Sequence, residues 1–235
     1  MISVEKINEV HLRVYTDPSV AQELSDFFTF EVPGARFTPA YKNRLWDGKI
    51  RLYDLHRKTL YVGLHEYLNK FAERNQYPIT YLNPVLNKTE INQEIVSKFV
   101  EFLNPCSRGN PIEIRDYQLD AVLKAIRDER TLLLSPTASG KSFIIYTLMR
   151  YHLEHARKCI IIVPTTSLVE QLYSDFEDYS TGNGWRVSKH CQKLYSGFTK
   201  DFTSEVLITT WQSIYKQPKE WFNSFDVIFG DRQSI

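Results

Sequence analysis

The stretch that decides the fold is Thr131–Leu–Leu–Leu134, followed by Ser135–Pro–Thr–Ala–Ser–Gly–Lys141–Ser142. It predicts a short apolar strand, a loop of small residues, and a helix that opens with Lys-Ser. Small residues let the backbone curl so that successive N–H groups face an anion, and the helix N-terminus adds positive potential. The stretch therefore predicts a phosphate-binding loop, with Lys141 on the β- and γ-phosphates and the Ser142 hydroxyl on Mg²⁺. The alternative is an ordinary strand–turn–helix crossover, and Ser135 stands where the common phosphate loop has Gly.

Beyond the loop, buried strands alternate with amphipathic helices. Strands are expected at 159–163, 206–209 and 226–229, and apolar residues recur at helical spacing after Lys141 and after Ser167. This alternation is typical of a parallel sheet covered by helices on both faces. Ligands of such folds bind at the carboxyl ends of the strands, where Pro164, Thr210 and Asp231 fall.

Composition limits the remaining possibilities. The 235 residues, 43% of them hydrophobic, fit one large or two small globular units. The net charge of +1 means that any affinity for nucleic acid must come from a local patch. The three cysteines form no Cys-x-x-Cys pair, which argues against a metal or disulfide framework and favours the reducing cytoplasm. No apolar stretch approaches the roughly 20 residues of a membrane span.

A domain boundary is expected at 104–111, where two prolines, a glycine and two asparagines favour a linker. Upstream, residues 1–103 mix alternating and helical apolar patterns without regular crossovers, which predicts a small α+β domain. Residues 112–235 then form the α/β domain. The predicted fold class is thus a P-loop parallel sheet preceded by a small α+β N-terminal domain.

The segment 36–58 interleaves cations with aromatic residues. Its cations outnumber its acids, and those we expect to bind nucleic acid are Lys42, Arg44, Lys49 and Arg51. Cations pair with phosphates, and exposed aromatic rings stack on unpaired bases. The alternative is a solvated basic hairpin whose aromatic residues belong to the core.

A polar helix start precedes the phosphate loop at Arg115–Asp–Tyr–Gln118. A tyrosine can stack on a purine, and a glutamine amide both donates and accepts, which matches the adenine edge. A polar helix start alone is common, but its position shortly before the loop strengthens the prediction of a nucleotide site.

These motifs, in this order, resemble those of superfamily 2 helicases and translocases. The resemblance rests on Arg115–Gln118, Ser135–Ser142, Ile162–Val–Pro–Thr–Thr–Ser–Leu168 with Gln171, and Ile208–Thr–Thr–Trp–Gln–Ser213. A small residue followed by Pro-Thr is usual at the start of the loop in this superfamily, whereas Ala138 stands where Gly is commoner. The resemblance implies an ATP site formed by Arg115, Tyr117, Gln118, Thr137, Ala138, Ser139, Gly140, Lys141 and Ser142. It further implies catalytic roles for Lys141 and Asp231, Mg²⁺ at Ser142 and Asp231, and DNA near Pro164, Thr165, Thr210 and Gln212.

A narrower resemblance covers essentially the whole chain. The chain is similar to the UvsW-type helicases of T-even phages in Tyr41–Lys–Asn–Arg–Leu–Trp–Asp–Gly–Lys–Ile–Arg–Leu–Tyr53 ahead of the helicase motifs, together with Val206–Trp211 and Lys216–Gln–Pro–Lys–Glu–Trp–Phe222. The resemblance implies an incomplete RecA-like first lobe and ATP-driven remodelling of branched DNA in recombination, repair or fork rescue. It also implies a monomer that lies in the host cytoplasm and not in a membrane.

The chain departs from the family pattern at Asp231–Arg–Gln–Ser–Ile235, where Asp-Glu-x-His is expected. Arg232 stands in place of the acid that positions the attacking water, and a cation cannot activate water in that way. We therefore keep open a truncated DNA- or nucleotide-binding fragment that does not hydrolyse ATP. The family's sheet order also leaves a gap between the strand of the phosphate loop and the strand that ends at Asp231.

Overall fold

The computed structural model describes residues 1–85, 89–128, 130–136, 138–195 and 202–231. The chain forms two units, Met1–Asn87 and Lys88–Ile235. The division lies earlier than the linker expected at 104–111. Helix α4 (Gln93–Leu103) belongs to the second unit because its buried Val96 packs with Leu119 and Val122 of helix α5 (Asp116–Asp128).

Unit 1 is built on a five-stranded sheet in the order β5-β6-β2-β1-β7, in which only the β1–β7 pair is parallel. Helices α1 and α3 pack on it through one apolar core, to which Val4, Leu12, Leu24, Leu68 and Phe71 contribute. This mixed arrangement is the predicted α+β fold. The bounds are β1 Ile2–Lys6, β2 His11–Tyr15, β5 Tyr53–Asp54, β6 Thr59–Tyr61, β7 Ile79–Tyr81, α1 Pro18–Phe27, the 3-10 turn η2 Val62–Leu64 and α3 His65–Arg74.

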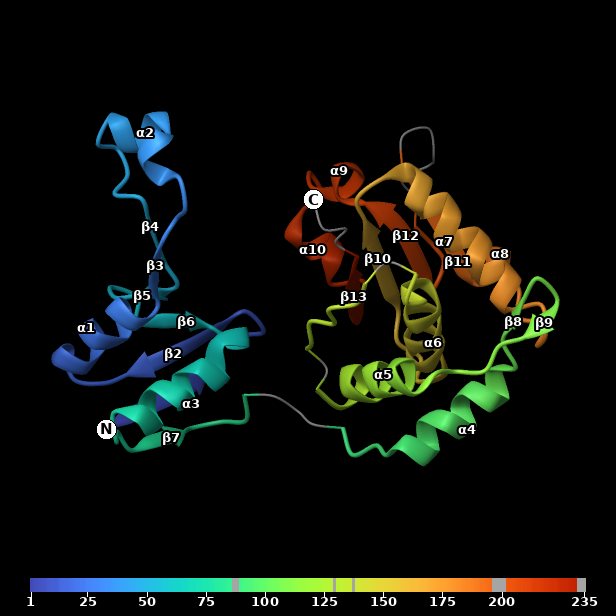
Figure 1. Cartoon of the computed structure of the whole chain (residues 1–235), viewed down its shortest axis with the longest axis horizontal. Helices are drawn as coiled ribbons and strands as arrows, with labels where there is room; N and C mark the ends of the chain where they lie inside the picture. The colour runs from blue at the N-terminus through green and yellow to red at the C-terminus, as the bar shows by residue number, and fades with distance from the viewer. Residues whose placement is uncertain (86–88, 129, 137, 196–201, 232–235) are drawn as a thin grey trace. The chain divides into compact units, whose positions relative to one another are not determined.

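An arm extends from unit 1 between α1 and β5. Its stem is a two-stranded antiparallel ribbon of β3 (Thr29–Glu31) and β4 (Lys49–Arg51). The segment between the two strands carries a 3-10 turn, η1 (Ala35–Phe37), and the short helix α2 (Pro39–Lys42) at the far end of the ribbon (Figure 1). We call β3 and β4 the arm stem and residues 34–46 the arm tip.

Unit 2 contains a parallel sheet in the order β11-β12-β10-β13. Helices α6 and α7 cover one face through a core that includes Met149, Ile161 and Phe176, and α9 and α10 lie on the other, where Ile214 packs with Ile160. Figure 1 shows α7 running beside β12 and β11. The bounds are β10 Cys159–Val163, β11 Cys191–Leu194, β12 Val206–Thr210, β13 Val227–Gly230, α6 Lys141–Glu154, α7 Thr166–Tyr179, α8 Val187–His190, α9 Trp211–Ile214 and α10 Lys219–Phe222.

The segment expected to be a linker is a small hairpin of unit 2. Strands β8 (Cys106–Ser107) and β9 (Asn110–Pro111) pair across a turn in which Arg108 and Gly109 have φ of 51° and 78°. The turn is fixed to α7, because the Asp178 carboxylate accepts hydrogen bonds from the Arg108 N–H (2.8 Å) and the Ser107 hydroxyl (3.1 Å). A hairpin turn with two positive φ angles favours Gly and Asn, which also favour linkers, so composition did not separate the two.

The strand expected at 131–134 does not form. These residues are not in any strand, and Leu132 and Leu134 are 80% and 90% exposed. Among the described residues, β13 pairs only with β10. An apolar run becomes a strand only when a neighbouring strand satisfies its backbone N–H and C=O groups. The family's sheet order predicted a gap between the strand of the phosphate loop and the strand that ends at Asp231. Residues 131–134, which precede the loop, are accordingly not paired with β13.

No helix in the described ranges is long and apolar enough to cross a membrane. The cysteines Cys106, Cys159 and Cys191 are free and buried. Burial raises the pKa of Cys159 to about 12, so this thiol stays protonated and packs as an apolar side chain.

Candidate nucleotide-binding site and nucleic-acid interface

The start of α6 places the phosphate loop. Gly140, with φ of 80°, immediately precedes the helix, and a Cβ at this position would collide with the Gln118 amide nitrogen. Only glycine meets both conditions without strain. Ala138 also has a positive φ, of 62°, which explains why glycine is the commoner residue there. Thr137, expected to contact nucleotide, lies outside the described residues.

The start of α5 is bonded directly to this loop. The Tyr117 hydroxyl and the Gln118 amide both donate to the Ser139 carbonyl, at 2.9 and 3.0 Å. The Gln118 carbonyl oxygen accepts the backbone N–H of Arg115 at 3.1 Å, and the Arg115 guanidinium donates to the Tyr117 hydroxyl at 3.2 Å. The residues expected to bind adenine and the loop expected to bind phosphate therefore form one hydrogen-bonded unit. The sequence did not predict that Gln118, which is only 6% exposed, also holds the loop backbone.

Serine hydroxyls and a lysine complete the loop. The Ser139 hydroxyl donates to the Pro136 carbonyl at 2.8 Å and contacts the Ser135 hydroxyl. The Lys141 ammonium donates to the Ser135 carbonyl at 3.2 Å, so its charge lies over the loop. Ser135, the departure from the common glycine, thus helps to shape the loop through both its side chain and its carbonyl.

The Ser142 hydroxyl faces α7. It lies 2.9 Å from the Tyr179 hydroxyl, and Asp175 of the same helix is near enough for Ser142 to affect its pKa. Burial raises the pKa of Asp175, although the Ser142 hydroxyl acts in the opposite direction. Sequence analysis did not find Asp175 or Tyr179, because their closeness to the loop depends on how α7 packs on α6.

A Mg²⁺ ion at this site would have few protein ligands. In the described part of the chain, no three His, Cys, Asp or Glu side chains cluster as a metal site would require. Mg²⁺ at nucleotide sites uses one or two protein ligands and completes its shell with phosphates and water. A hydroxyl at Ser142 and a carboxylate at Asp231 match that pattern in chemistry.

Two hollows flank the loop. One, of about 200 Å³, is lined by Ser135 and Lys141 on one side and by β13 with Asp231 on the other. Asp231 is held there because its backbone N–H donates to the Ile162 carbonyl at 3.0 Å. The second, of about 570 Å³, is lined by Tyr117, Ser139 and the apolar residues ahead of the loop. Arg232, in the departing motif, lies outside the described residues.

The residues expected near DNA stand at the carboxyl ends of two neighbouring strands. Pro164 and Thr165 follow β10, and the Thr165 hydroxyl caps α7 by accepting the Leu168 N–H at 3.3 Å. Thr210 ends β12 and is 3% exposed, and its hydroxyl lies 2.9 Å from that of Ser213. Gln212, on α9, is exposed.

Two exposed aromatic residues accompany them that sequence reasoning did not select. Trp211 and Tyr215 are 57% and 55% exposed, and they lie four residues apart, about one helical turn. The Lys216 ammonium lies 5.5 Å from the centroid of the Tyr215 ring. Two large exposed apolar side chains four residues apart in a helical segment were the available signal.

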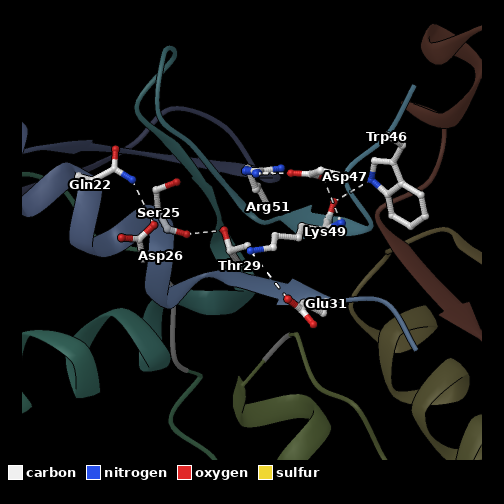
Figure 2. Close-up of polar contacts among 9 residues, drawn as sticks. All are labelled: Gln22, Ser25, Asp26, Thr29, Glu31, Trp46, Asp47, Lys49 and Arg51. Carbon is white, nitrogen blue, oxygen red and sulfur yellow. Dashed lines mark hydrogen bonds and ion pairs between the residues drawn. The ribbon is translucent and has the colours of Figure 1, made fainter. Parts of the chain in front are cut away.

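In unit 1, the arm separates the four cations expected to bind nucleic acid. Figure 2 shows the stem, where Arg51 is paired with Asp47 at 2.5 Å and Lys49 with Glu31 at 3.8 Å. The Arg51 guanidinium beside Asp47 lowers the pKa of that carboxyl, so the pair stays ionised. Lys42 and Arg44 lie in the arm tip instead, where they line a hollow of about 610 Å³.

A parallel sheet, a Gly-Lys-Ser helix start and an adjoining Tyr-Gln motif define the ATP-binding lobe of a RecA-like motor protein. Two family descriptions match the chain: "Type III restriction enzyme, res subunit" over residues 111–232, and "DNA helicase UvsW, N-terminal" over residues 2–82. The chain belongs to the superfamily 2 helicases and, within them, to the UvsW family.

Individual relatives agree with this assignment. The ATP-dependent DNA helicase uvsW of Enterobacteria phage T4 is 38% identical over 229 residues, which are 94% of this chain and 44% of that protein. A DNA 3'-5' translocase of Sulfurisphaera tokodaii, XPB2, is 26% identical over 51% of this chain and 25% of its own length. The crystal structure of the UvsW helicase from bacteriophage T4 matches with a TM-score of 0.85 at 35% identity, over 98% of this chain and 82% of that one. The chain thus spans less than half the length of the curated relatives that it matches.

Proposed function

We propose that this chain carries the ATP-binding and DNA-contacting functions of an ATP-dependent DNA helicase or translocase that acts on branched DNA. Recombination, repair and replication-fork rescue are the processes that such remodelling serves. The observation that carries the proposal is the hydrogen-bonded unit of Tyr117 and Gln118 with Ser139 of the phosphate loop. It joins the motif proposed to read the purine to the loop proposed to hold the phosphates, an arrangement that ATP requires and that a chance Gly-Lys-Ser turn would not produce.

In this proposal Tyr117 stacks on adenine, Gln118 reads its edge, and Arg115 holds the Tyr117 hydroxyl. The Lys141 ammonium leaves the Ser135 carbonyl for the β- and γ-phosphates, where a cation stabilises the charge that develops during phosphoryl transfer. Mg²⁺, when held by Ser142 and Asp231, would neutralise further phosphate charge. These residues position and stabilise; their geometry supplies no covalent step.

The DNA-contacting residues are proposed at the carboxyl edge of the sheet. Pro164, Thr165, Thr210 and Gln212 follow neighbouring strands β10 and β12 there, close in the fold to the end of β13 and Asp231. Hydroxyls, amides and backbone N–H groups contact the phosphates of DNA without reading its sequence. A motor that moves along any sequence requires contacts of this kind.

The test is nucleotide binding by the 235-residue chain, followed with a fluorescent ATP analogue in the presence of Mg²⁺. Lys141→Ala is expected to weaken binding by about tenfold or more, because a hydrogen bond to a charged group contributes roughly 1.5–3 kcal/mol. Lys124→Ala, which removes an exposed lysine of α5 paired with Asp128, is the matched control and is expected to have no effect. Equal affinity in the Lys141→Ala variant would contradict the phosphate-loop assignment.

The second candidate is a protein that binds nucleotide and DNA without hydrolysis, and Arg232 is the observation that favours it. We expect the 235-residue chain to bind ATP without measurable hydrolysis, because a cation replaces the acid that positions the attacking water. Phosphate release is measured with and without forked DNA. DNA-stimulated release that Lys141→Ala abolishes would show that the chain is an active ATPase.

A further inference from the structure

The arm tip exposes apolar side chains beside uncompensated positive charge. Phe37, Tyr41 and Leu45 are 67%, 42% and 81% exposed, and residues 34–46 contain the cations Arg36, Lys42 and Arg44 but no acid. In the described part of unit 1, none of these three cations is paired with a carboxylate. The arm stem differs, because Lys49 and Arg51 both have acidic partners.

The tip is held in one conformation by its own packing. Gly48, with φ of 77°, lets the chain return so closely that a Cβ there would lie 3.0 Å from the Ala35 methyl group and 3.1 Å from the Tyr41 ring. The Thr38 hydroxyl donates to the Ala35 carbonyl at 2.7 Å and caps α2 by accepting the Tyr41 N–H. The exposed side chains of the tip are therefore presented from a fixed backbone and need little ordering on binding.

The base of the tip is also fixed. The Trp46 indole donates to the Lys49 carbonyl at 2.9 Å, while Lys49 and Arg51 are held by ion pairs across and along the ribbon (Figure 2). At the far end, the Arg36 guanidinium lies 4.9 Å from the centroid of the Phe37 ring. A cation thus stands next to an exposed aromatic face on a rigid support.

Few kinds of partner have a surface complementary to the arm tip, which combines positive charge with exposed apolar side chains. A single-sign cationic surface attracts a polyanion, whereas exposed Phe and Leu side chains gain free energy only against an apolar surface. Duplex DNA offers phosphates but keeps its base faces stacked inside. Where base pairing ends, phosphates and unstacked base faces lie side by side, and exposed aromatic side chains stack on such bases.

We propose that the arm tip binds DNA at the point where base pairing ends, with its apolar side chains against the unpaired bases and its cations against the adjoining phosphates. The inference rests on the proposed DNA-directed function and names the feature of branched DNA that this unit recognises. The arm stem supports the tip and does not contact DNA phosphates itself.

The test compares forked DNA, a duplex with two unpaired arms, with a blunt duplex of equal length, by fluorescence anisotropy of the 235-residue chain without nucleotide. Phe37→Ala combined with Leu45→Ala is expected to weaken fork binding by about tenfold and to leave duplex binding unchanged, since stacking contributes roughly 1–3 kcal/mol per base. Phe30→Ala is the matched control, because Phe30 is an aromatic residue of the stem that is 48% exposed. It is expected to change neither affinity.

A second set of variants tests the role of the positive charges through the salt dependence of DNA binding. Changing Arg36, Lys42 and Arg44 to Ala is expected to lower the log–log salt slope by about 0.7–0.9 for each phosphate that the variant no longer neutralises. Changing Lys49 and Arg51 to Ala is expected to leave the slope unchanged. Because Arg36, Lys42, Arg44 and Arg51 are exposed and Lys49 is partly exposed, thermal unfolding of each variant is expected to match closely that of the unchanged chain, which separates weaker DNA binding from damage to the fold.

Three outcomes overturn the inference. If the Phe37→Ala, Leu45→Ala variant binds both the fork and the duplex as tightly as the unchanged chain does, the tip does not contact bases. An equal loss of affinity for both DNAs shows general binding without recognition of the junction. Binding of an acidic protein that the tip variants abolish, with DNA binding intact, identifies a different partner. In each case Lys141-dependent ATP binding remains, so failure here is distinct from failure of the proposed function.

Discussion

Single residues of the site divide into those that the sequence identifies and those that only packing reveals. Gly140 follows from a local rule, because the positive φ just before the helix favours glycine, and Lys141 is recognised by its place in the Gly-Lys-Ser motif. Asp175 and Tyr179 reach the Ser142 hydroxyl from α7, more than thirty residues along the chain. No local pattern encodes that contact, so sequence reasoning did not find it.

His152 gives unit 2 a dependence on pH. The side chain is mostly buried beside the hollow that contains Lys141 and Asp231, and its Nδ1 has no hydrogen-bond partner among the described residues. Burial, together with the nearby charges of Arg157 and His155, lowers the pKa of His152 to about 4. The unfolded chain takes up a proton near pH 6.5, whereas the folded chain does so only near pH 4.

The folded state is therefore fully stabilised above pH 6.5 and loses stability as the pH falls toward 4. At pH 5 the loss is expected to be roughly 1–2 kcal/mol, after allowance for the exposed part of the ring. Denaturant unfolding at pH 7.5 and pH 5 measures it, and His152→Leu is expected to reduce the difference by that amount. His56→Ala, an exposed histidine of unit 1, is expected to leave the difference as it is. An unchanged pH dependence in His152→Leu would contradict the assignment.

At the scale of elements, apolar runs in the sequence predicted β10, β12 and β13 well. They failed for the edge strand β11 and for residues 131–134. Strands β10, β12 and β13 lie within one residue of their expected positions. The apolar runs of β10 and β12 are buried almost throughout, and β13 pairs with β10. Strand β11 was missed because Gln192 and Lys193 interrupt its apolar pattern at the sheet edge. The expected strand 131–134 has the apolar pattern but lacks a neighbouring strand. Pairing, which the local sequence does not specify, decided both errors.

The α9 segment gives a prediction about DNA. Trp211 and Tyr215 are exposed beside Gln212 at the carboxyl end of β12, where the proposed DNA path runs. Changing both to Ala is expected to weaken binding of single-stranded DNA by about tenfold, because each aromatic stack on a base contributes roughly 1–3 kcal/mol. Filter binding or anisotropy with an unpaired oligonucleotide measures the change.

Tyr67→Ala provides the control for that change. Tyr67 is 54% exposed on α3 and lies beside Lys70, with the ammonium 5.3 Å from the ring centroid, so it matches the Tyr215–Lys216 pair in chemistry. Its removal is expected to leave affinity unchanged. If the Trp211 and Tyr215 substitutions had no larger effect than Tyr67→Ala, the exposed aromatic pair would serve some purpose other than stacking on DNA.

At the scale of the whole molecule, the two units differ in whether apolar side chains are exposed beside the main sheet. The first has one continuous core beneath its five-stranded sheet. The second leaves Leu132 and Leu134 exposed ahead of the phosphate loop, and Ile228 on β13 is 58% exposed. Exposed apolar side chains next to a strand with one unpaired edge, within the described residues, promote association between molecules. We therefore expect residues 1–87 to unfold cooperatively and the second unit to be the less stable one.

The residue at which the chain is divided decides how the second unit behaves when it is produced alone. Ending the N-terminal piece at residue 104, as the predicted linker implied, removes α4 and with it the buried Val96, Val100 and Leu103. Full burial of each such side chain contributes about 1.5–3 kcal/mol, so their loss amounts to much of the 5–15 kcal/mol that typically stabilises a domain. Residues 88–235 are expected to show a cooperative thermal transition and protected amides in β10 and β12, whereas residues 112–235 are expected to bind a hydrophobic dye and unfold without a sharp transition. Equal cooperativity of the two pieces would show that α4 is not part of the folded unit.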